Sequence, residues 1–216
     1  MMYKAVIFDL DGTLLNTLTD LYNSVNYALC SFGFPERTID EVRRFIGNGV
    51  KKLMERSTPE GTDEETNAKC LDAFREHYLQ HMADNTAPYE GVNELIEKLR
   101  ADGIRTAVVS NKLHSAVVGL CKDYFPSIEE AIGVSVEEER KPNPVNVIKV
   151  LDSFGISADE CIYVGDSEVD VQTAHNAGVK CIGVTWGFRD EEELIKNGAD
   201  FIAHTSDEVL KKVSEC

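Results

Sequence analysis

No stretch of the 216-residue sequence approaches the length of a membrane-spanning helix, which needs about 20 apolar residues. The apolar run nearest the N-terminus covers residues 3–8 and is interrupted by Asp9, so it is too short for the core of a signal peptide. We therefore expect a cytoplasmic protein that makes no contact with a membrane.

Paired cysteines are also missing, because no two of the six cysteines stand in a C-x-x-C spacing. Several of them fall inside apolar runs, where a reduced thiol behaves as a small hydrophobic side chain. This scatter predicts reduced, mostly buried thiols and argues against a disulfide framework or a zinc site. The cysteines are Cys30, Cys70, Cys121, Cys161, Cys181 and Cys216.

Basic residues are few: 22 Lys and Arg stand against 38 Asp and Glu, which gives a formal net charge of −16. A field of this sign repels the phosphates of a nucleic acid, so we expect no nucleic-acid partner. The same field opposes small anionic substrates. A phosphorylated substrate would need a local group of metal ion, lysine and backbone N–H to reverse the sign.

The sequence does contain enough apolar material for a folded core, since 43% of its residues are hydrophobic. Within residues 17–84 there is no convincing strand pattern, and apolar residues recur at helical spacing in four successive segments. Capping boxes formed by Thr38 with Glu41 and by Thr62 with Glu65 predict the starts of the second and fourth helices. We predict that residues 17–84 form an inserted, all-α helical cap domain.

Strand and helix patterns alternate in the rest of the chain. Short apolar, β-branched runs at 4–10, 105–109 and 161–164 predict buried strands, and helical patterns follow them. Repeated β–α units predict an α/β fold, a Rossmann-like parallel sheet with helices on both faces. We assign residues 1–16 and 85–216 to this core domain.

Polar side chains stand where three of the predicted strands end. Asp9 and Asp11 end the first strand, Ser110 follows the strand at 105–109, and Asp166 follows the strand at 161–164, with Asp170 four residues later. Ligands of parallel sheets bind beyond the carboxyl ends of the strands. Carboxylates gathered there would repel one another unless a hard cation neutralised them, and oxygen ligands suit Mg²⁺.

These residues belong to four short motifs that occur in order along nearly the whole chain. The motifs are Asp9-Leu10-Asp11-Gly12-Thr13, Val108-Val109-Ser110-Asn111-Lys112, Lys141-Pro142-Asn143-Pro144 and Gly165-Asp166-Ser167-x-x-Asp170. Each motif is a weak signal alone, but the four in this order resemble those of the haloacid dehalogenase superfamily of phosphatases. The resemblance implies phosphoryl transfer rather than dehalogenation, because dehalogenases of this superfamily lack the second aspartate.

The resemblance also implies the catalytic roles of the carboxylates. Asp9 is expected to attack phosphorus and become an aspartyl phosphate. Asp11 is expected to protonate the leaving alkoxide and then to deprotonate the water that attacks the intermediate. Mg²⁺ would be held by the carboxylates of Asp9 and Asp166 and the backbone carbonyl of Asp11, while Asp170 would orient the metal's water ligands or Lys141, or ligate the metal itself.

Two further motif residues are expected to bind the transferring phosphoryl group. By the same resemblance, Ser110 and Lys141 would contact its oxygens and stabilise charge in the transition state. Backbone N–H groups near Leu10 and Asn111 are expected to assist, which makes Asn111 a candidate substrate-binding residue.

The helical insert resembles the cap of the phosphoglycolate phosphatase-like subfamily, and one of its segments resembles that subfamily closely. In that segment Gly47, Asn48 and Gly49 precede a helical stripe, and backbone N–H groups at a helix start suit a carboxylate. We therefore name these three as candidate substrate-binding residues. The alternative, an ordinary loop between two cap helices, stays open.

The sequence thus predicts a magnesium-dependent phosphatase of a small phosphorylated metabolite, with 2-phosphoglycolate as the best single substrate. A phosphomutase of the β-phosphoglucomutase kind and a pyrophosphatase are alternatives that share the motifs. A non-catalytic metabolite sensor is an alternative of another class. The sequence leaves open whether the protein is a monomer or a homodimer.

Overall fold

The computed structural model describes residues 3–214, which divide into two compact units. The core unit comprises the chain up to Leu15 together with the chain from Pro88 onward, and the helical unit is Asn16–Ala87. The sequence analysis placed these boundaries at 16/17 and 84/85. Among the described helices, none is both long and apolar enough to cross a membrane.

The chain passes between the units through two very short strands. β2 (Leu15–Asn16) leads out of the core unit and β3 (Ala87–Pro88) leads back, and the two strands pair with each other. The sequence pattern did not predict these strands, because two residues are too few to show a periodicity.

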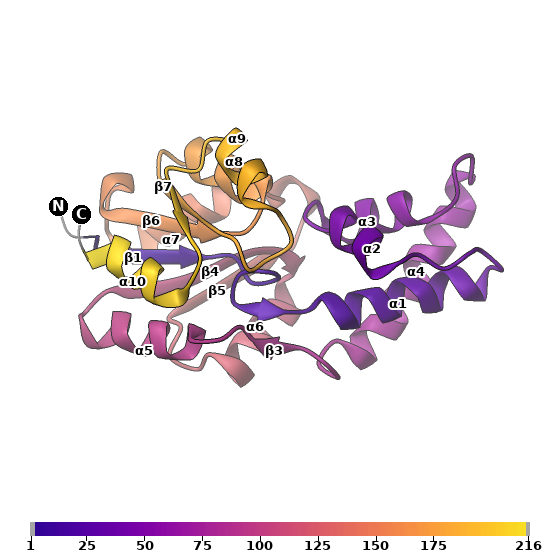
Figure 1. The fold of residues 1–216 in the computed structure, drawn as a ribbon, viewed down its shortest axis with the longest axis horizontal. Coiled ribbons are helices and arrows are strands. Elements are labelled where there is room, and N and C mark those ends of the chain that lie inside the picture. The colour runs from indigo at the N-terminus through magenta and orange to yellow at the C-terminus, as the bar shows by residue number, and fades with distance from the viewer. Residues whose placement is uncertain (1–2, 215–216) are drawn as a thin grey trace. The chain divides into compact units, whose positions relative to one another are not determined.

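The core unit is built on a six-stranded sheet with the order β5-β4-β1-β6-β7-β8, in which all the pairings are parallel (Figure 1). This confirms the predicted α/β fold. The strands are β1 (Ala5–Phe8), β4 (Arg105–Leu113), β5 (Glu130–Val134), β6 (Cys161–Gly165), β7 (Lys180–Val184) and β8 (Phe201–Ala203).

The register of the central strands brings the carboxyl ends of β1 and β6 nearly level. Phe8, the last residue of β1, pairs with Val108 of β4 on one side and with Val164 of β6 on the other. The predicted strand at 4–10 was too long, because after Phe8 the chain donates one more bond, from Asp9 N to Val164 O at 2.9 Å, and then turns. Asp9 therefore stands at the edge of the sheet.

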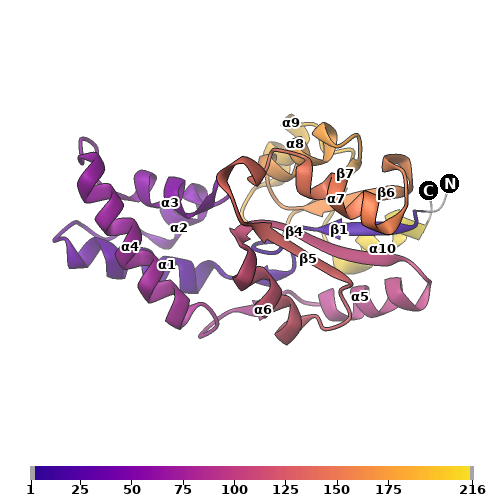
Figure 2. The ribbon, with the colours of Figure 1, turned by 180° about the vertical axis from the view of Figure 1, so that it is seen from behind.

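Helices cover both faces of the sheet, and the side chains of β1 alternate between them. Val6 and Phe8 belong to the hydrophobic cluster under α5, α6 and α10, whereas Ala5 and Ile7 belong to the cluster under α7, α8 and α9 (Figures 1 and 2). A strand buried on both faces is apolar throughout, as this one is. The helices are α5 (Val92–Ala101), α6 (His114–Tyr124), α7 (Val145–Phe154), α8 (Glu168–Asn176), α9 (Glu191–Lys196) and α10 (Ser206–Ser214).

The helical unit consists of the four predicted helices. They are α1 (Leu18–Ser31), α2 (Ile39–Phe45), α3 (Gly49–Ser57) and α4 (Glu64–His81). Apolar side chains from all four are buried, among them Val25, Val42, Leu53 and Phe74. The capping box of Thr38 and Glu41 at the start of α2 is confirmed, with both of its reciprocal bonds present.

The capping box predicted at Thr62 and Glu65 is wrong. Helix α4 begins one residue later than that box requires, and its N-cap is Asp63, whose carboxylate accepts a bond from Thr66 N at 2.9 Å. The hydroxyl of Thr62 instead donates to Pro59 O at 2.6 Å in the preceding turn. Asp is a better N-cap than Thr, and the preceding turn already uses the hydroxyl of Thr62.

Strand β4 also differs from the prediction, which ended it before Ser110. The strand continues to Leu113, and its pairing with β5 shifts register between Val109 and Leu113. Such an irregularity leaves extra residues on one strand and bends it. Ser110 to Lys112 therefore lie in an irregular stretch within the strand, not in a turn beyond its end.

The described cysteines are free thiols, as predicted. Four of them are buried and Cys30 is exposed, while Cys216 lies outside the described residues. The buried four are Cys70, Cys121, Cys161 and Cys181.

Candidate active site

Three carboxylates meet at the carboxyl edge of the sheet. Asp9 follows β1, Asp166 follows β6 and Asp170 lies in the first turn of α8. All three are buried, and one carboxylate oxygen from each lies within 4.8 Å of the others. Among the described residues, this is the one group of three or more His, Cys, Asp or Glu side chains close enough together to hold a metal ion.

The ammonium group of Lys141 lies between two of these carboxylates. Its Nζ is 2.8 Å from Asp9 Oδ1 and 2.7 Å from Asp170 Oδ1, and the hydroxyl of Tyr163 lies 3.2 Å away. Burial alone would lower the pKa of Lys141, but the charges of Asp170 and Asp9 outweigh it and hold that pKa well above its ordinary value. Lys141 is therefore a permanent positive charge in the cluster.

One lysine does not balance three buried carboxylates. Burial raises the pKa of Asp9 to about 7, against the attraction of Lys141 and with the repulsion of Asp170. Burial, followed by the charges of Asp170 and Asp9, also raises the pKa of Asp166 well above its ordinary value. With all three ionised, two negative charges remain uncompensated, which is the charge that one divalent cation neutralises. The donor set, carboxylate oxygens only, suits a hard cation.

Asp166 is held from two sides by hydrogen bonds. Thr13 Oγ1 donates to its Oδ1 at 3.2 Å, and the backbone N–H of Phe188 donates to its Oδ2 at 2.7 Å. Gly12 and Gly187 pack so closely on it that a Cβ on either would lie 2.4 Å from an atom of Asp166. The loop after β7 therefore packs directly on Asp166.

Both oxygens of Asp170 have partners within the protein. Oδ1 is paired with Lys141, and Oδ2 accepts bonds from the backbone N–H of Ser167 at 3.1 Å and from its hydroxyl at 2.6 Å. Ser167 and Asp170 thus form a reciprocal capping box at the start of α8. This arrangement fixes the position of Asp170 and lets it orient Lys141.

The side chain of Asn111 holds the backbone of Lys141. Its Oδ1 accepts from Lys141 N at 2.7 Å, and its Nδ2 donates to Lys141 O at 3.3 Å. The hydroxyl of Ser110 accepts a bond from Lys112 N at 3.3 Å. The irregular stretch of β4 therefore supports both Lys141 and Lys112.

Asp11 has a partner that the sequence analysis did not assign. Its carboxylate is not part of the three-carboxylate group; instead, Lys112 Nζ lies 3.1 Å from its Oδ1 and 3.3 Å from its Oδ2. The Lys112 side chain is only 6% exposed. Lys112 follows Ser110 and Asn111 directly in the second motif, so its position in the sequence was the available signal.

The candidate substrate-binding residues Gly47, Asn48 and Gly49 belong to the helical unit. Asn48 is the N-cap of α3, but its side chain does not cap the helix. Its Oδ1 accepts from Arg56 Nη2 at 2.7 Å, and Arg56 Nη1 donates to Phe45 O at 2.9 Å. Arg56 thus braces the segment between α2 and α3, and the role of this segment toward substrate stays a prediction.

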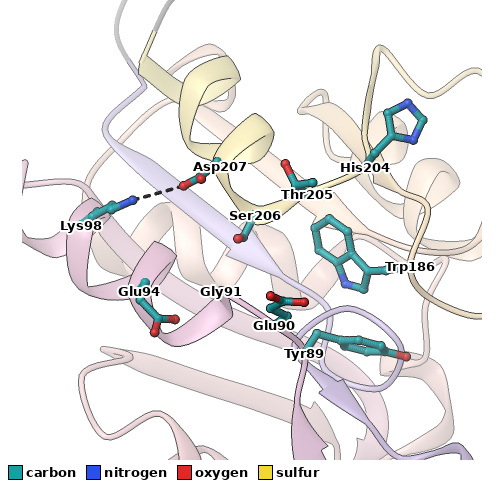
Figure 3. Close-up of a pocket in the computed structure, with 10 residues that line it drawn as sticks. All are labelled: Tyr89, Glu90, Gly91, Glu94, Lys98, Trp186, His204, Thr205, Ser206 and Asp207. Atoms are coloured by element: carbon teal, nitrogen blue, oxygen red, sulfur yellow. Dashed lines mark hydrogen bonds and ion pairs between the residues drawn. The ribbon is translucent and has the colours of Figure 1, made fainter.

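The core unit also has a cavity of about 600 Å³, whose lining includes none of the three carboxylates (Figure 3). The side chain of Trp186 forms part of its wall and donates from Nε1 to Thr13 O at 3.0 Å. Lys98 and Asp207 form an ion pair across another part of the wall. The remaining lining residues are Tyr89, Glu90, Gly91, Glu94, His204, Thr205 and Ser206.

Comparison with known proteins agrees with this arrangement. The family model of the haloacid dehalogenase-like hydrolases matches residues 6–184. A phosphoglycolate phosphatase from Vibrio parahaemolyticus is 31% identical over 98% of this chain and 96% of its own length. A phosphoglycolate phosphatase from Aquifex aeolicus is 32% identical over 86% of each chain.

A solved structure gives the same result for the fold. A crystal structure from Lactobacillus delbrueckii subsp. bulgaricus, described as a candidate phosphoglycolate phosphatase, is 33% identical, with a TM-score of 0.94 over 99% of both chains. The motifs, the sheet and the buried acidic group all agree with these matches. The chain therefore belongs to the haloacid dehalogenase-like hydrolase family and groups with its phosphatases.

Proposed function

We propose that the protein hydrolyses phosphate monoesters of small metabolites with the help of Mg²⁺, and that 2-phosphoglycolate is its best substrate. The observation that carries the proposal is the position of Asp9, a buried carboxylate 2.8 Å from Lys141 and grouped with Asp166 and Asp170. Phosphoglycolate is proposed because the similar proteins from Vibrio parahaemolyticus and Aquifex aeolicus carry the name phosphoglycolate phosphatase.

Asp9 is the proposed nucleophile. A carboxylate oxygen of Asp9 forms a bond to phosphorus while the bond from phosphorus to the ester oxygen breaks, which gives an aspartyl phosphate and an alcohol. A water molecule then attacks the phosphorus, inorganic phosphate leaves, and the Asp9 carboxylate is restored. Burial favours this role, because it removes the hydration shell that would otherwise weaken a carboxylate nucleophile.

Asp11 is the proposed acid and base. It gives a proton to the departing ester oxygen in the first step and takes one from the attacking water in the second. This role is supported by its position two residues after Asp9, beyond the end of β1. The ion pair with Lys112 fixes the direction of its carboxylate.

Lys141, Ser110 and the metal ion have separate proposed roles. Lys141 and Ser110 bind oxygens of the phosphoryl group and stabilise the charge that develops on them. The proposed Mg²⁺ ligands are the carboxylates of Asp9 and Asp166 and the backbone carbonyl of Asp11. When bound, the metal neutralises the carboxylates and polarises the phosphoryl group.

The test is phosphate release by the purified protein with MgCl₂ and a panel of phosphate esters and pyrophosphate. We expect hydrolysis of 2-phosphoglycolate with the highest kcat/KM, and loss of turnover in Asp9→Asn. The matched control is Asp123→Asn, which changes an exposed carboxylate on α6 and should leave the activity intact.

Other outcomes would replace the proposal. Isomerisation of a sugar phosphate without net phosphate release would make the protein a phosphomutase, and activity on pyrophosphate alone would make it a pyrophosphatase. A folded protein that binds phosphometabolites and turns over none of them would be a sensor.

A further inference from the structure

Lys112 is a buried lysine of the second motif, and the family resemblance assigns it no role. Its side chain is 6% exposed, and its ammonium group contacts both oxygens of Asp11, at 3.1 and 3.3 Å. The irregular stretch of β4 places it there, and its backbone N–H is bonded to the hydroxyl of Ser110 at 3.3 Å. A buried ammonium is expensive to desolvate, so its charge is only tolerated beside an anion.

The two lysines of the site hold different carboxylates. Lys141 is paired with Asp9 and Asp170, whereas Lys112 is paired with Asp11. In the proposed reaction Asp9 receives the phosphoryl group and Asp11 serves the departing oxygen. Lys141 therefore stands at the phosphoryl end of the substrate, and Lys112 stands at the leaving-group end.

We propose that Lys112 determines specificity, by binding a carboxylate on the carbon atom that carries the ester oxygen. The substrate class is then the phosphate monoesters of 2-hydroxy acids, of which 2-phosphoglycolate is the smallest. This inference rests on the proposed function, because it places the ester oxygen beside Asp11. Such a carboxylate lies two bonds from the ester oxygen, within reach of a group in contact with Asp11.

Charge makes this site selective. The protein as a whole is strongly acidic, with a net charge of −16, so a substrate with both a phosphate and a carboxylate gains nothing from the general field. An ammonium with three donor hydrogens can serve both the Asp11 carboxylate and a substrate carboxylate. Because the group is buried, its attraction for an anion is screened less than that of a surface lysine.

The experiment compares two substrates of similar size, 2-phosphoglycolate and 2-hydroxyethyl phosphate, in which an uncharged hydroxymethyl group replaces the carboxylate. For each variant we take the ratio of the two kcat/KM values, the acid over the alcohol. The variants are Lys112→Met, which removes the charge and keeps most of the volume, and Lys112→Arg, which keeps the charge. Lys122→Met is the matched control, since Lys122 is an exposed lysine on α6.

We expect the ratio to fall about 30-fold or more in Lys112→Met, the usual effect of removing one member of a buried charge pair. In Lys112→Arg and in Lys122→Met the ratio should stay within about threefold of wild type. Circular dichroism checks that each variant is folded, and Lys112→Gln replaces Lys112→Met if the latter is not.

Three results would overturn the inference. Equal losses for both substrates would mean that Lys112 only positions Asp11. An equal fall of the ratio in the Met and Arg variants would mean that the substrate is recognised by the shape of the Lys112 side chain and not by its charge. A wild-type enzyme that prefers the alcohol would exclude the carboxylate site. If wild type hydrolysed neither ester nor any other in the panel, the proposed function itself would fail, which is a different result.

Discussion

The hydroxyl of Tyr163 lies 3.2 Å from the ammonium group of Lys141. Tyr163 is on β6, and the same hydroxyl donates to Val109 O on β4 at 3.0 Å, although β1 lies between these strands. The side chain is completely buried, and burial raises the pKa of Tyr163 well above its ordinary value, so the phenol keeps its proton. One hydroxyl therefore connects Lys141 to the strand that carries Ser110.

Replacing Tyr163 by Phe should weaken the position of Lys141. Val109 O and the lysine each lose a partner, so we expect a loss of about 1–3 kcal/mol in the free energy of unfolding. The value of kcat should fall as well, because Lys141 would bind the phosphoryl group less accurately. Denaturant unfolding and steady-state kinetics measure the two effects.

The matched control for this change is Tyr27→Phe, at a tyrosine that is 52% exposed and stacked on His77. It should change neither quantity. Wild-type kcat in a folded Tyr163→Phe variant would show that Lys141 is held adequately by its two carboxylates.

Magnesium should stabilise the protein more as the pH rises. In the metal-free protein the pKa of Asp9 is raised from 3.8 to about 7, so the folded state holds a proton that the unfolded state has lost between these values. Raising the pH through this window therefore lowers the stability of the metal-free protein. Mg²⁺ binds the deprotonated carboxylate and recovers that stability above about pH 7.

Thermal unfolding with and without millimolar MgCl₂ tests this at about pH 5.5 and about pH 8. The increase in Tm on adding MgCl₂ should be larger at the higher pH. In Asp9→Asn the pH dependence of this increase should be much reduced. A Tm increase that is the same at both pH values would contradict the proposed role of Asp9 as a metal ligand.

Gly187 should not tolerate a methyl group. A Cβ at this position would lie 2.4 Å from Asp166 Cβ and 2.4 Å from Gly12 O, so the loop after β7 or Asp166 itself would have to move. We expect Gly187→Ala to lower the free energy of unfolding by about 1–3 kcal/mol. It should also lower both the apparent affinity for Mg²⁺ and the activity.

Gly119 offers the matched control, because it lies within α6 and a Cβ there would meet nothing within 4 Å. Gly119→Ala should be neutral or stabilise the protein by up to about 1 kcal/mol. Titration of activity with MgCl₂ measures the apparent affinity in both variants. Unchanged metal affinity in Gly187→Ala would mean that Asp166 does not bind the ion.

Asp20 should be the most sensitive carboxylate of the helical unit. It is 2% exposed, and its oxygens accept bonds from the backbone N–H groups of Asn85 and Thr86, at 2.9–3.0 Å, and from both side chains, at 2.8 Å. Asp20→Ala would leave these donors without a partner, and we expect a loss of about 2–4 kcal/mol.

The control for this change is Asp72→Ala, at an exposed position on α4. Its effect should stay within about 0.5 kcal/mol. Thermal unfolding followed by circular dichroism compares the two variants. Equal, small effects would show that the chain entering β3 is held by other contacts than Asp20.

The sheet and its acidic edge were predictable because their signals are local. A run such as Ala5–Phe8, apolar on both faces, is typical of a central parallel strand. The rule that ligands lie beyond the carboxyl ends of strands then placed Asp9 and Asp166 together without coordinates. The same holds for Thr38 and Glu41, whose capping bonds span only three residues.

Contacts between distant segments were not predictable. Nothing near Gly187 in the sequence shows that it packs on Asp166, and nothing near Lys112 shows that it reaches Asp11, beyond the end of the neighbouring strand β1. Even local signals failed where two adjacent candidates competed, as at Thr62 and Asp63, because the turn before the helix takes up the Thr62 hydroxyl.

The sequence by itself determined that Asp9 and Asp166 meet, since local apolar patterns mark where each strand ends and parallel strands end at the same edge of a sheet; the family resemblance added Lys141. Only the tertiary structure decided how they are held: by Tyr163 across the sheet, by Phe188 from the loop after β7, and by the irregular stretch of β4 that aims Lys112. The reason is physical. Burial and ion pairing depend on what packs around a group in three dimensions, and that surrounding is assembled from segments far apart in the chain.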